Sequence, residues 1–105
     1  MVVIGAFRRD PELVKNSQAE VLLAKQLGLE IARRRHAKNW SQQKLAEAIG
    51  RTPNHVQNLE SGLSDRNKRT LANPRLDTLI ALSKALDVPL PEFIESVLAG
   101  VPGTD

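Results

Sequence analysis

The sequence predicts an all-α fold, a compact five-helix domain with an N-terminal arm. Apolar residues recur at spacings of three and four along five short segments, the period of a helix that buries one face. Aromatic residues make up only 3% of the chain, which is little for a sheet whose strands favour aromatic side chains. The length of 105 residues fits one domain and leaves little room for a second.

The first predicted helix covers residues 18–38. It follows a capping-box pattern, Ser-Gln-Ala-Glu, at residues 17–20. Its inner apolar stripe is Leu23, Leu27 and Ile31. Asn39 tolerates the left-handed backbone that ends a helix, and Trp40 is expected to fold back over that end as a core plug.

Two shorter helices follow with only a few residues between them. One covers about 41–49, with Ser41 as its cap and Gly50 as its stop. The next covers about 53–61, and Thr52-Pro53 supplies its cap and first position. Two helices of this length joined by three residues form a helix-turn-helix arrangement.

The sequence of the remaining residues predicts a polar loop and two more helices. Residues 64–73 are polar and basic without an apolar period, so we expect a loop there. A fourth helix is expected to open at Asn73-Pro74, and a fifth covers 91–99, beyond the break at Pro89. The apolar residues of the fourth helix expected to face inward are Leu76, Leu79, Ile80, Leu82 and Leu86.

These elements divide the chain into three parts. Residues 1–19 form the N-terminal arm, residues 20–99 the helical domain, and residues 100–105 a tail. The arm opens with the apolar run Met1–Phe7, which is followed by two arginines and has no basic leader, so it does not predict a signal peptide.

Composition argues against an enzyme and against a membrane protein. Cysteine is absent, and His36 and His55 are the only histidines, so we expect no catalytic group, no metal and no cofactor. No apolar run approaches the length of about 18 residues that a membrane span needs.

The net charge of +3 is distributed unevenly. Residues 1–75 hold 14 Lys and Arg against 7 Asp and Glu, whereas residues 76–105 hold one lysine against 5 acidic residues. The basic residues gather at Arg33-Arg34-Arg35 and around residues 66–69. A basic face with an acidic opposite end is typical of a phosphate-binding module, although two solvated charge runs would look the same.

The third predicted helix has two different faces. At about 100° per residue, Val56 and Leu59 gather on one side, and the polar residues gather on the other. Those polar residues are Asn54, Gln57, Asn58 and Ser61. An amide side chain donates and accepts at once, so it matches the adjacent donor and acceptor of adenine in the major groove of DNA. The alternative is an ordinary soluble surface.

The run from Leu27 to Phe93 resembles the Cro/repressor (Xre-type) helix-turn-helix family. The Ser-Gln to Glu-x-Gly stretch, residues 41–62, is its most specific part. The residues that carry the resemblance are Leu27-Gly28, Ile31, Arg35, Ser41-Gln42, Leu45-Ala46, Gly50 through Leu59-Glu60, Gly62, Leu76, Thr78-Leu79, Leu82, Ala85-Leu86 and Val88.

The resemblance implies a repressor-like DNA-binding domain whose third helix enters the major groove. The base-reading positions it implies are Thr52, Pro53, Asn54, Gln57 and Asn58. Pro53 occupies a position that often carries a polar side chain, so its contact would be apolar, for instance with a thymine methyl. Gln42 and Ser61 match phosphate-contacting positions, and Arg35 matches a position that pairs with that of Glu60 as a structural pair.

Further phosphate contacts are expected from position alone. Gln43 lies beside Gln42, and His55 lies at the side of the third helix. Three basic residues follow the third helix closely, at a place where they could contact phosphates beside the groove: Arg66, Lys68 and Arg69. A solvated loop whose charges aid solubility is the alternative for these three.

The predicted function is a sequence-specific transcriptional regulator, most simply a repressor that binds a palindromic operator as a homodimer. The dimer is expected through the fifth helix, with Phe93, Val97 and Val101, and with Val2-Val3-Ile4 and Phe7 of the arm as a possible contribution. The expected partner is double-stranded DNA, and a regulatory protein is a further candidate. The expected location of the protein is the cytoplasm, at the nucleoid. An autoregulating antitoxin, a restriction–modification controller and a protein-interaction module on the same fold stay open as alternatives.

Overall fold

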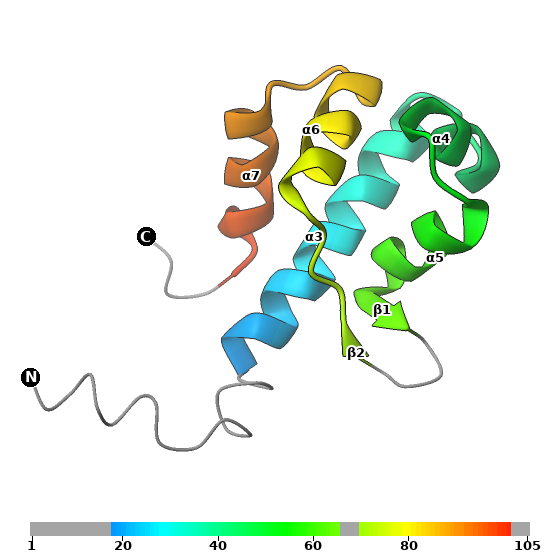
Figure 1. Cartoon of the computed structure of the whole chain (residues 1–105). Helices are drawn as coiled ribbons and strands as arrows, with labels where there is room; N and C mark the ends of the chain where they lie inside the picture. Colours follow the sequence, from blue (N-terminus) through cyan, green and yellow to red (C-terminus); the bar gives the residue numbers. More distant parts are fainter. Residues whose placement is uncertain (1–17, 66–69, 102–105) are drawn as a thin grey trace, which may run out of the picture.

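The structure is a computed structural model that describes residues 18–65 and 70–101. These residues form five helices and one short antiparallel ribbon, so the predicted all-α fold is confirmed (Figure 1). The helices are α3 (Gln18–Ala37), α4 (Gln42–Ile49), α5 (Pro53–Ser61), α6 (Leu76–Ala85) and α7 (Leu90–Ala99). The N-terminal arm through residue 17 and the tail from residue 102 lie outside the described residues.

The long helix α3 is the element on which the others are arranged. It crosses the molecule, with α5 packed on one side and α7 on the other (Figure 1). The core forms where these helices meet α4 and α6. Its most deeply buried large side chains are Ile31, Leu45, Val56, Leu82 and Phe93. Trp40 packs against this core at the end of α3, as the sequence predicts.

The helix ends follow from capping and left-handed residues. Asn39 has φ 58° just after α3, and Gly50 and Gly62 have φ 70° and 80° at the ends of α4 and α5. The Ser41 hydroxyl accepts the Lys44 backbone N–H at 3.0 Å and so caps α4. These predicted boundaries are therefore confirmed to within one residue.

The predicted polar loop over residues 64–73 is wrong in part. Strand β1 (Leu63–Asp65) pairs with β2 (Thr70–Leu71) in an antiparallel ribbon, with Leu63 opposite Leu71. Ala72 N–H then donates to Gly62 O at 2.9 Å, which ties the end of the ribbon to the end of α5. Strands this short hold too few residues to show an alternating apolar pattern.

The inward face of α6 differs from the predicted one. Leu82 and Leu86 are buried as predicted. Leu76 is 64% exposed and Ile80 37% exposed, however, and the polar Thr78 and Ser83 are buried instead. The helix begins at Leu76 rather than at residue 74, because Arg75 still has the extended backbone of an N-cap. Its buried face is therefore a mixed polar and apolar one, which hydrophobic spacing alone does not identify.

Three apolar residues at the fifth predicted helix, which the sequence assigns to a dimer surface, are buried in the structure. Phe93, Val97 and Val101 are 0%, 3% and 5% exposed. Helix α7 packs Phe93 and Val97 into the core of its own subunit, and Val101 is buried just after the helix ends. The prediction that the core leaves these three side chains exposed for a dimer contact is wrong. Leu98, at 36%, is the large apolar residue of α7 that the described structure leaves exposed.

Candidate nucleic-acid interface

Helices α4 and α5 form the predicted helix-turn-helix. They pack directly on one another, and the turn of Gly50, Arg51 and Thr52 joins them. The Thr52 hydroxyl accepts the His55 backbone N–H at 3.1 Å, and Pro53 takes the first helical position. Val56 and Leu59 anchor the inner face of α5 in the core, which fixes which side of α5 points outward.

The outward face of α5 carries short polar side chains. Asn54 and Gln57 are exposed, and among the described residues neither side chain has a hydrogen-bond partner. Pro53 is exposed beside them, and Asn58 is half-buried and has an interaction within the described chain. Two amides at one helical face therefore present donors and acceptors to whatever lies opposite.

A buried network joins α3, α4 and α5 behind this face. Arg35 Nε and Nη2 donate to the two carboxylate oxygens of Glu60 at 2.6 and 3.0 Å. Gln42 Nε2 donates to Glu60 Oε1 at 2.9 Å, and Arg35 Nη1 donates to Trp40 O at 2.8 Å. The Glu60 carboxylate, near the end of α5, thus holds Arg35 of α3 through a two-point contact and the first residue of α4 through one hydrogen bond.

The other predicted phosphate residues fall in different places. Gln43 is exposed on the first turn of α4. Ser61 is exposed at the end of α5, and its hydroxyl donates to Asn58 O at 2.7 Å. The predicted loop contacts all lie outside the described residues; they are Arg66, Lys68 and Arg69.

The imidazole of His55 is turned inward rather than outward. Its Nε2 is buried and has no hydrogen-bond partner among the described residues. Burial, and then the positive charge of Arg51, hold the pKa of His55 below its ordinary value of 6.5. At neutral pH the ring is therefore uncharged, which disfavours a phosphate contact by this side chain.

Acidification is expected to destabilise the wild-type chain more than a His55→Gln variant. Since the pKa of folded His55 lies below 6.5, the unfolded chain takes up the proton first as the pH falls. The stability that the neutral ring contributes is complete above pH 6.5 and is lost below it. Urea unfolding of both proteins at about pH 7.5 and about pH 5.5 measures the difference. Equal losses in the two proteins would contradict a shielded His55.

Arg51 is a residue of the site that sequence reasoning missed. It lies in the turn between α4 and α5, and its Nη2 donates to Thr78 Oγ1 of α6 at 3.1 Å. Its Nη1 lies 3.4 Å from Gly50 O. The signal in the sequence was a lone arginine at the centre of the turn. This side chain holds a positive charge at the start of α5.

The basic run of α3 is largely paired with carboxylates. Arg33 Nη2 lies 2.6 Å from Glu30 Oε2, and Arg34 also pairs with Glu30 while reaching Ser96 of α7 at 3.3 Å. Burial alone raises the pKa of Glu30, but the hydrogen bonds and charges of Arg33 and Arg34 outweigh it, so the pKa lies below its ordinary value. Arg33, Arg34 and Arg35 therefore each have a carboxylate partner within the chain, which weakens the interpretation of this run as part of a basic, phosphate-binding face.

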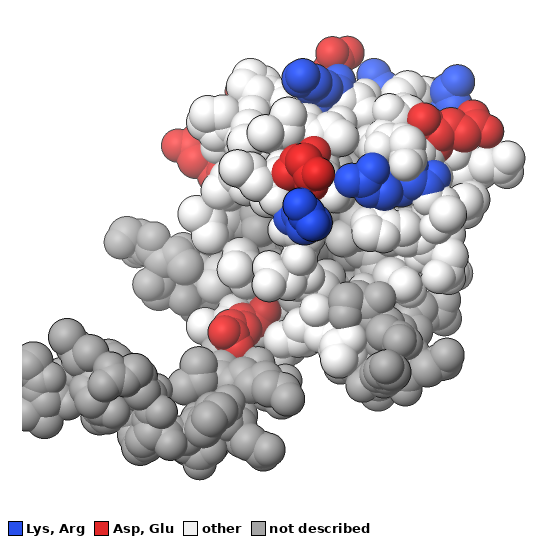
Figure 2. Space-filling view, in the orientation of Figure 1, with Lys and Arg blue, Asp and Glu red and all other residues white. Residues whose placement is uncertain are grey.

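The charged side chains do not form one continuous basic patch on the visible face. Figure 2 shows Lys and Arg side chains beside Asp and Glu side chains over the upper part of the molecule, in the orientation of Figure 1. Lys38 and Lys44 lie over the Trp40 ring, with Nζ 4.8 and 5.9 Å from its centroid. These contacts place two cations beside the start of α4.

The described residues contain no group of three or more His, Asp or Glu that could hold a metal ion. Within the same residues, no helix is long and apolar enough to cross a membrane.

Comparison with known families agrees with this geometry. A family model described as helix-turn-helix matches residues 29–93, which is more than half of the chain. The matched range contains α4, the turn and α5, together with Arg35 and Glu60. A search of curated proteins found no match to the chain.

Proposed function

The chain belongs to the Xre-type helix-turn-helix family of DNA-binding transcriptional regulators, and we propose that it acts as a repressor that binds a palindromic operator as a homodimer. The observation that carries this proposal is the outward face of α5, where Asn54 and Gln57 are exposed and unpartnered within the described chain. In the major groove each amide can pair with the acceptor and donor of an adenine. We place the protein in the cytoplasm at the nucleoid.

Phosphate contacts on either side of the groove would fix the depth and tilt of α5. Gln42 supports this role, because its Nε2 carries two N–H groups and one of them donates to Glu60. That contact orients the amide, and the second N–H can reach a phosphate oxygen. A Gln42→Ala change would then weaken binding to all sequences alike, since phosphates carry no sequence information.

A dimer is needed because one helix in one groove buries too little surface to select a site. Two copies related by a two-fold axis would present two α5 helices to half-sites about one DNA turn apart. With Phe93, Val97 and Val101 inside their own subunit, the contact has to use other side chains. Leu76 and Ile80 form an exposed pair on α6 and suit this role.

Asn54→Ala and Gln57→Ala are each expected to weaken binding to the operator by about 1–3 kcal/mol and to relax one base position. The operator is first found by selecting bound duplexes from a random pool, which also gives its symmetry and spacing. Titration of that duplex with each variant measures the loss. Gln18→Ala, which removes an exposed amide at the start of α3, is the matched control and should change nothing.

A selection that enriches no sequence, or alanine variants that bind like the wild type, would contradict the base-reading role of α5. Enrichment of an asymmetric single site would contradict the dimer while leaving base reading intact.

A protein-interaction module on the same fold is the second candidate function. The observation that favours it is that the outward face of α5 carries no Lys or Arg, as the sequence of Pro53–Ser61 shows. Titration against random duplex at two salt concentrations separates the two candidates. A DNA-binding protein loses affinity steeply as salt rises, whereas an interaction module binds little at either concentration.

A further inference from the structure

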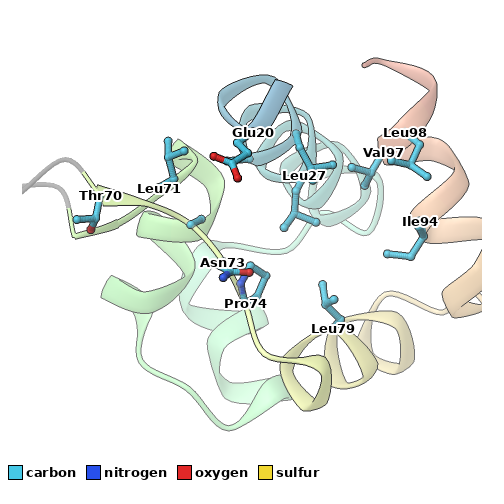
Figure 3. A pocket seen from close by; sticks show the side chains of 13 residues that line it. Glu20, Leu27, Thr70, Leu71, Asn73, Pro74, Leu79, Ile94, Val97 and Leu98 are labelled. Carbon is cyan, nitrogen blue, oxygen red and sulfur yellow. The ribbon is translucent and has the colours of Figure 1, made fainter. Parts of the chain in front are cut away.

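A largely apolar groove runs between the first half of α3, strand β2 and helices α6 and α7. Its volume is about 730 Å³. Leu27 of α3, Leu79 of α6 and Ile94 of α7 point into the same space (Figure 3). None of the predicted DNA-contacting residues that the structure describes lines the groove. Base reading by the outward face of α5 therefore does not involve this groove.

The two ends of the groove differ in polarity. Val97 and Leu98 form an apolar end at α7, whereas Glu20 and Thr70 lie at the end near β2 (Figure 3). Leu98 and Leu23 line the groove while 36% and 43% exposed, so two large aliphatic side chains remain in contact with water there. An occupant that buried both would gain hydrophobic stabilisation.

We propose that this groove is the docking site of the chain's own N-terminal segment, Met1–Phe7, which binds to the subunit that carries it. The segment reads Met-Val-Val-Ile-Gly-Ala-Phe and contains no charged residue, and Arg8-Arg9 follow directly. This order matches the groove. The apolar residues meet the aliphatic wall of α7, and the two arginines come to lie at the end that holds the Glu20 carboxylate.

The length of the connection allows the segment to return to the groove. Phe7 is joined to Gln18, the first described residue of α3, by ten residues that span up to about 33 Å when extended. The groove follows α3 from Glu20 to Leu27, a rise of about 10 Å along the helix axis. The chain can therefore reverse at the start of α3 and place Met1–Phe7 along the groove.

Tethering favours the segment of the same subunit over any other occupant. A connection of only ten residues would hold the segment near the groove at an effective concentration of about a millimolar. A second copy or an apolar ligand at micromolar concentration competes poorly with it. The segment would also cover Leu71 of the ribbon that follows α5, and so couple the arm to the end of α5.

The absence of cysteine from the chain makes a cross-linking test specific. Val3→Cys or Ile4→Cys is combined with Leu98→Cys in the groove, and the full chain is oxidised at low concentration. We expect an intramolecular disulfide, seen as a faster-running monomer, in several-fold higher yield than in the matched control. The control pairs the same arm cysteine with Leu29→Cys, which is 58% exposed on α3 and does not line the groove.

Methyl NMR of the full chain gives a second measurement that needs no disulfide. Ile4→Asp is expected to shift the methyl signals of Leu23, Ile94 and Leu98, whereas Val14→Asp, in the same arm but outside the apolar run, leaves them unchanged. The proposal is overturned by equal cross-linking in both pairs, by a disulfide between two copies, or by methyl signals that respond alike to both substitutions. Because no DNA is present, these outcomes are independent of the proposed repressor function.

Discussion

Glu60→Ala is expected to lower the free energy of unfolding by about 3–5 kcal/mol, because it leaves a buried arginine without its carboxylate. The side chains of Arg35 and Glu60 are only 10% and 8% exposed, so water cannot replace the lost partner. Arg35 would keep Trp40 O and a contact to the His36 ring. Gln42 would lose its hydrogen bond to Glu60 at the same time. Urea unfolding monitored by circular dichroism measures the change.

Two further variants separate the contribution of the Glu60 charge to stability from that of its hydrogen bonds. Glu60→Gln keeps an oxygen that can accept from Arg35 and should lose less stability than Glu60→Ala. In the double variant Arg35→Ala/Glu60→Ala the losses should not add, since the buried unpaired charge is removed together with its partner. If Glu60→Ala unfolds at the same urea concentration as the wild type yet binds its operator less selectively, the structural role assigned to this pair is wrong.

The helices could be predicted because their ends are encoded locally. Ser41 and Thr52 cap α4 and α5, and Asn39, Gly50 and Gly62 adopt the left-handed backbone that stops a helix. Each of these signals acts within a few residues of the chain. The antiparallel ribbon could not be predicted in this way, because its pairing depends on residues brought together across the loop.

The sequence predicts which residues of α5 point outward at the candidate site. It does not predict the hydrogen bonds behind that face. The helical period places Asn54 and Gln57 outward, as the structure also has them. The contact of Gln42 with Glu60 joins residues 18 positions apart, and no local spacing indicates it. The pairing of Arg34 with Glu30 could have been found, since the two residues lie one helical turn apart.

His55 shows why a residue type alone does not assign a phosphate contact. Its position at the side of α5 is compatible with a ring that points outward or inward. The side-chain rotamer decides between these two orientations. The structure turns Nε2 into a buried position beside Arg51, where a proton would be unfavourable. The same turn that joins α4 to α5 thus carries a charged arginine and a neutral histidine, and Arg51 is the better candidate for an anion.

Gly28→Ala is expected to destabilise the protein by about 1–3 kcal/mol or more, against the usual trend for such a change. Replacing a helical glycine with alanine normally stabilises a helix by about 1 kcal/mol. Here the added Cβ would lie 2.5 Å from Glu60 O and 2.7 Å from Leu59 O. Both are backbone atoms at the end of α5, so they cannot rotate away. Helix α5 would have to move off α3, which would also disturb the carboxylate that holds Arg35.

Gly100→Ala is the matched control, since the atoms nearest to its added Cβ belong to the flexible Gln26 side chain, which can rotate away. Thermal unfolding of both variants should show a clear loss for Gly28→Ala and little change for Gly100→Ala. Operator affinity should fall with Gly28→Ala even well below its unfolding temperature, because the spacing of α3 and α5 sets where Asn54 and Gln57 point. If the Gly28→Ala protein is as stable as the wild type, then α3 and α5 do not lie so close together that only a glycine fits between them.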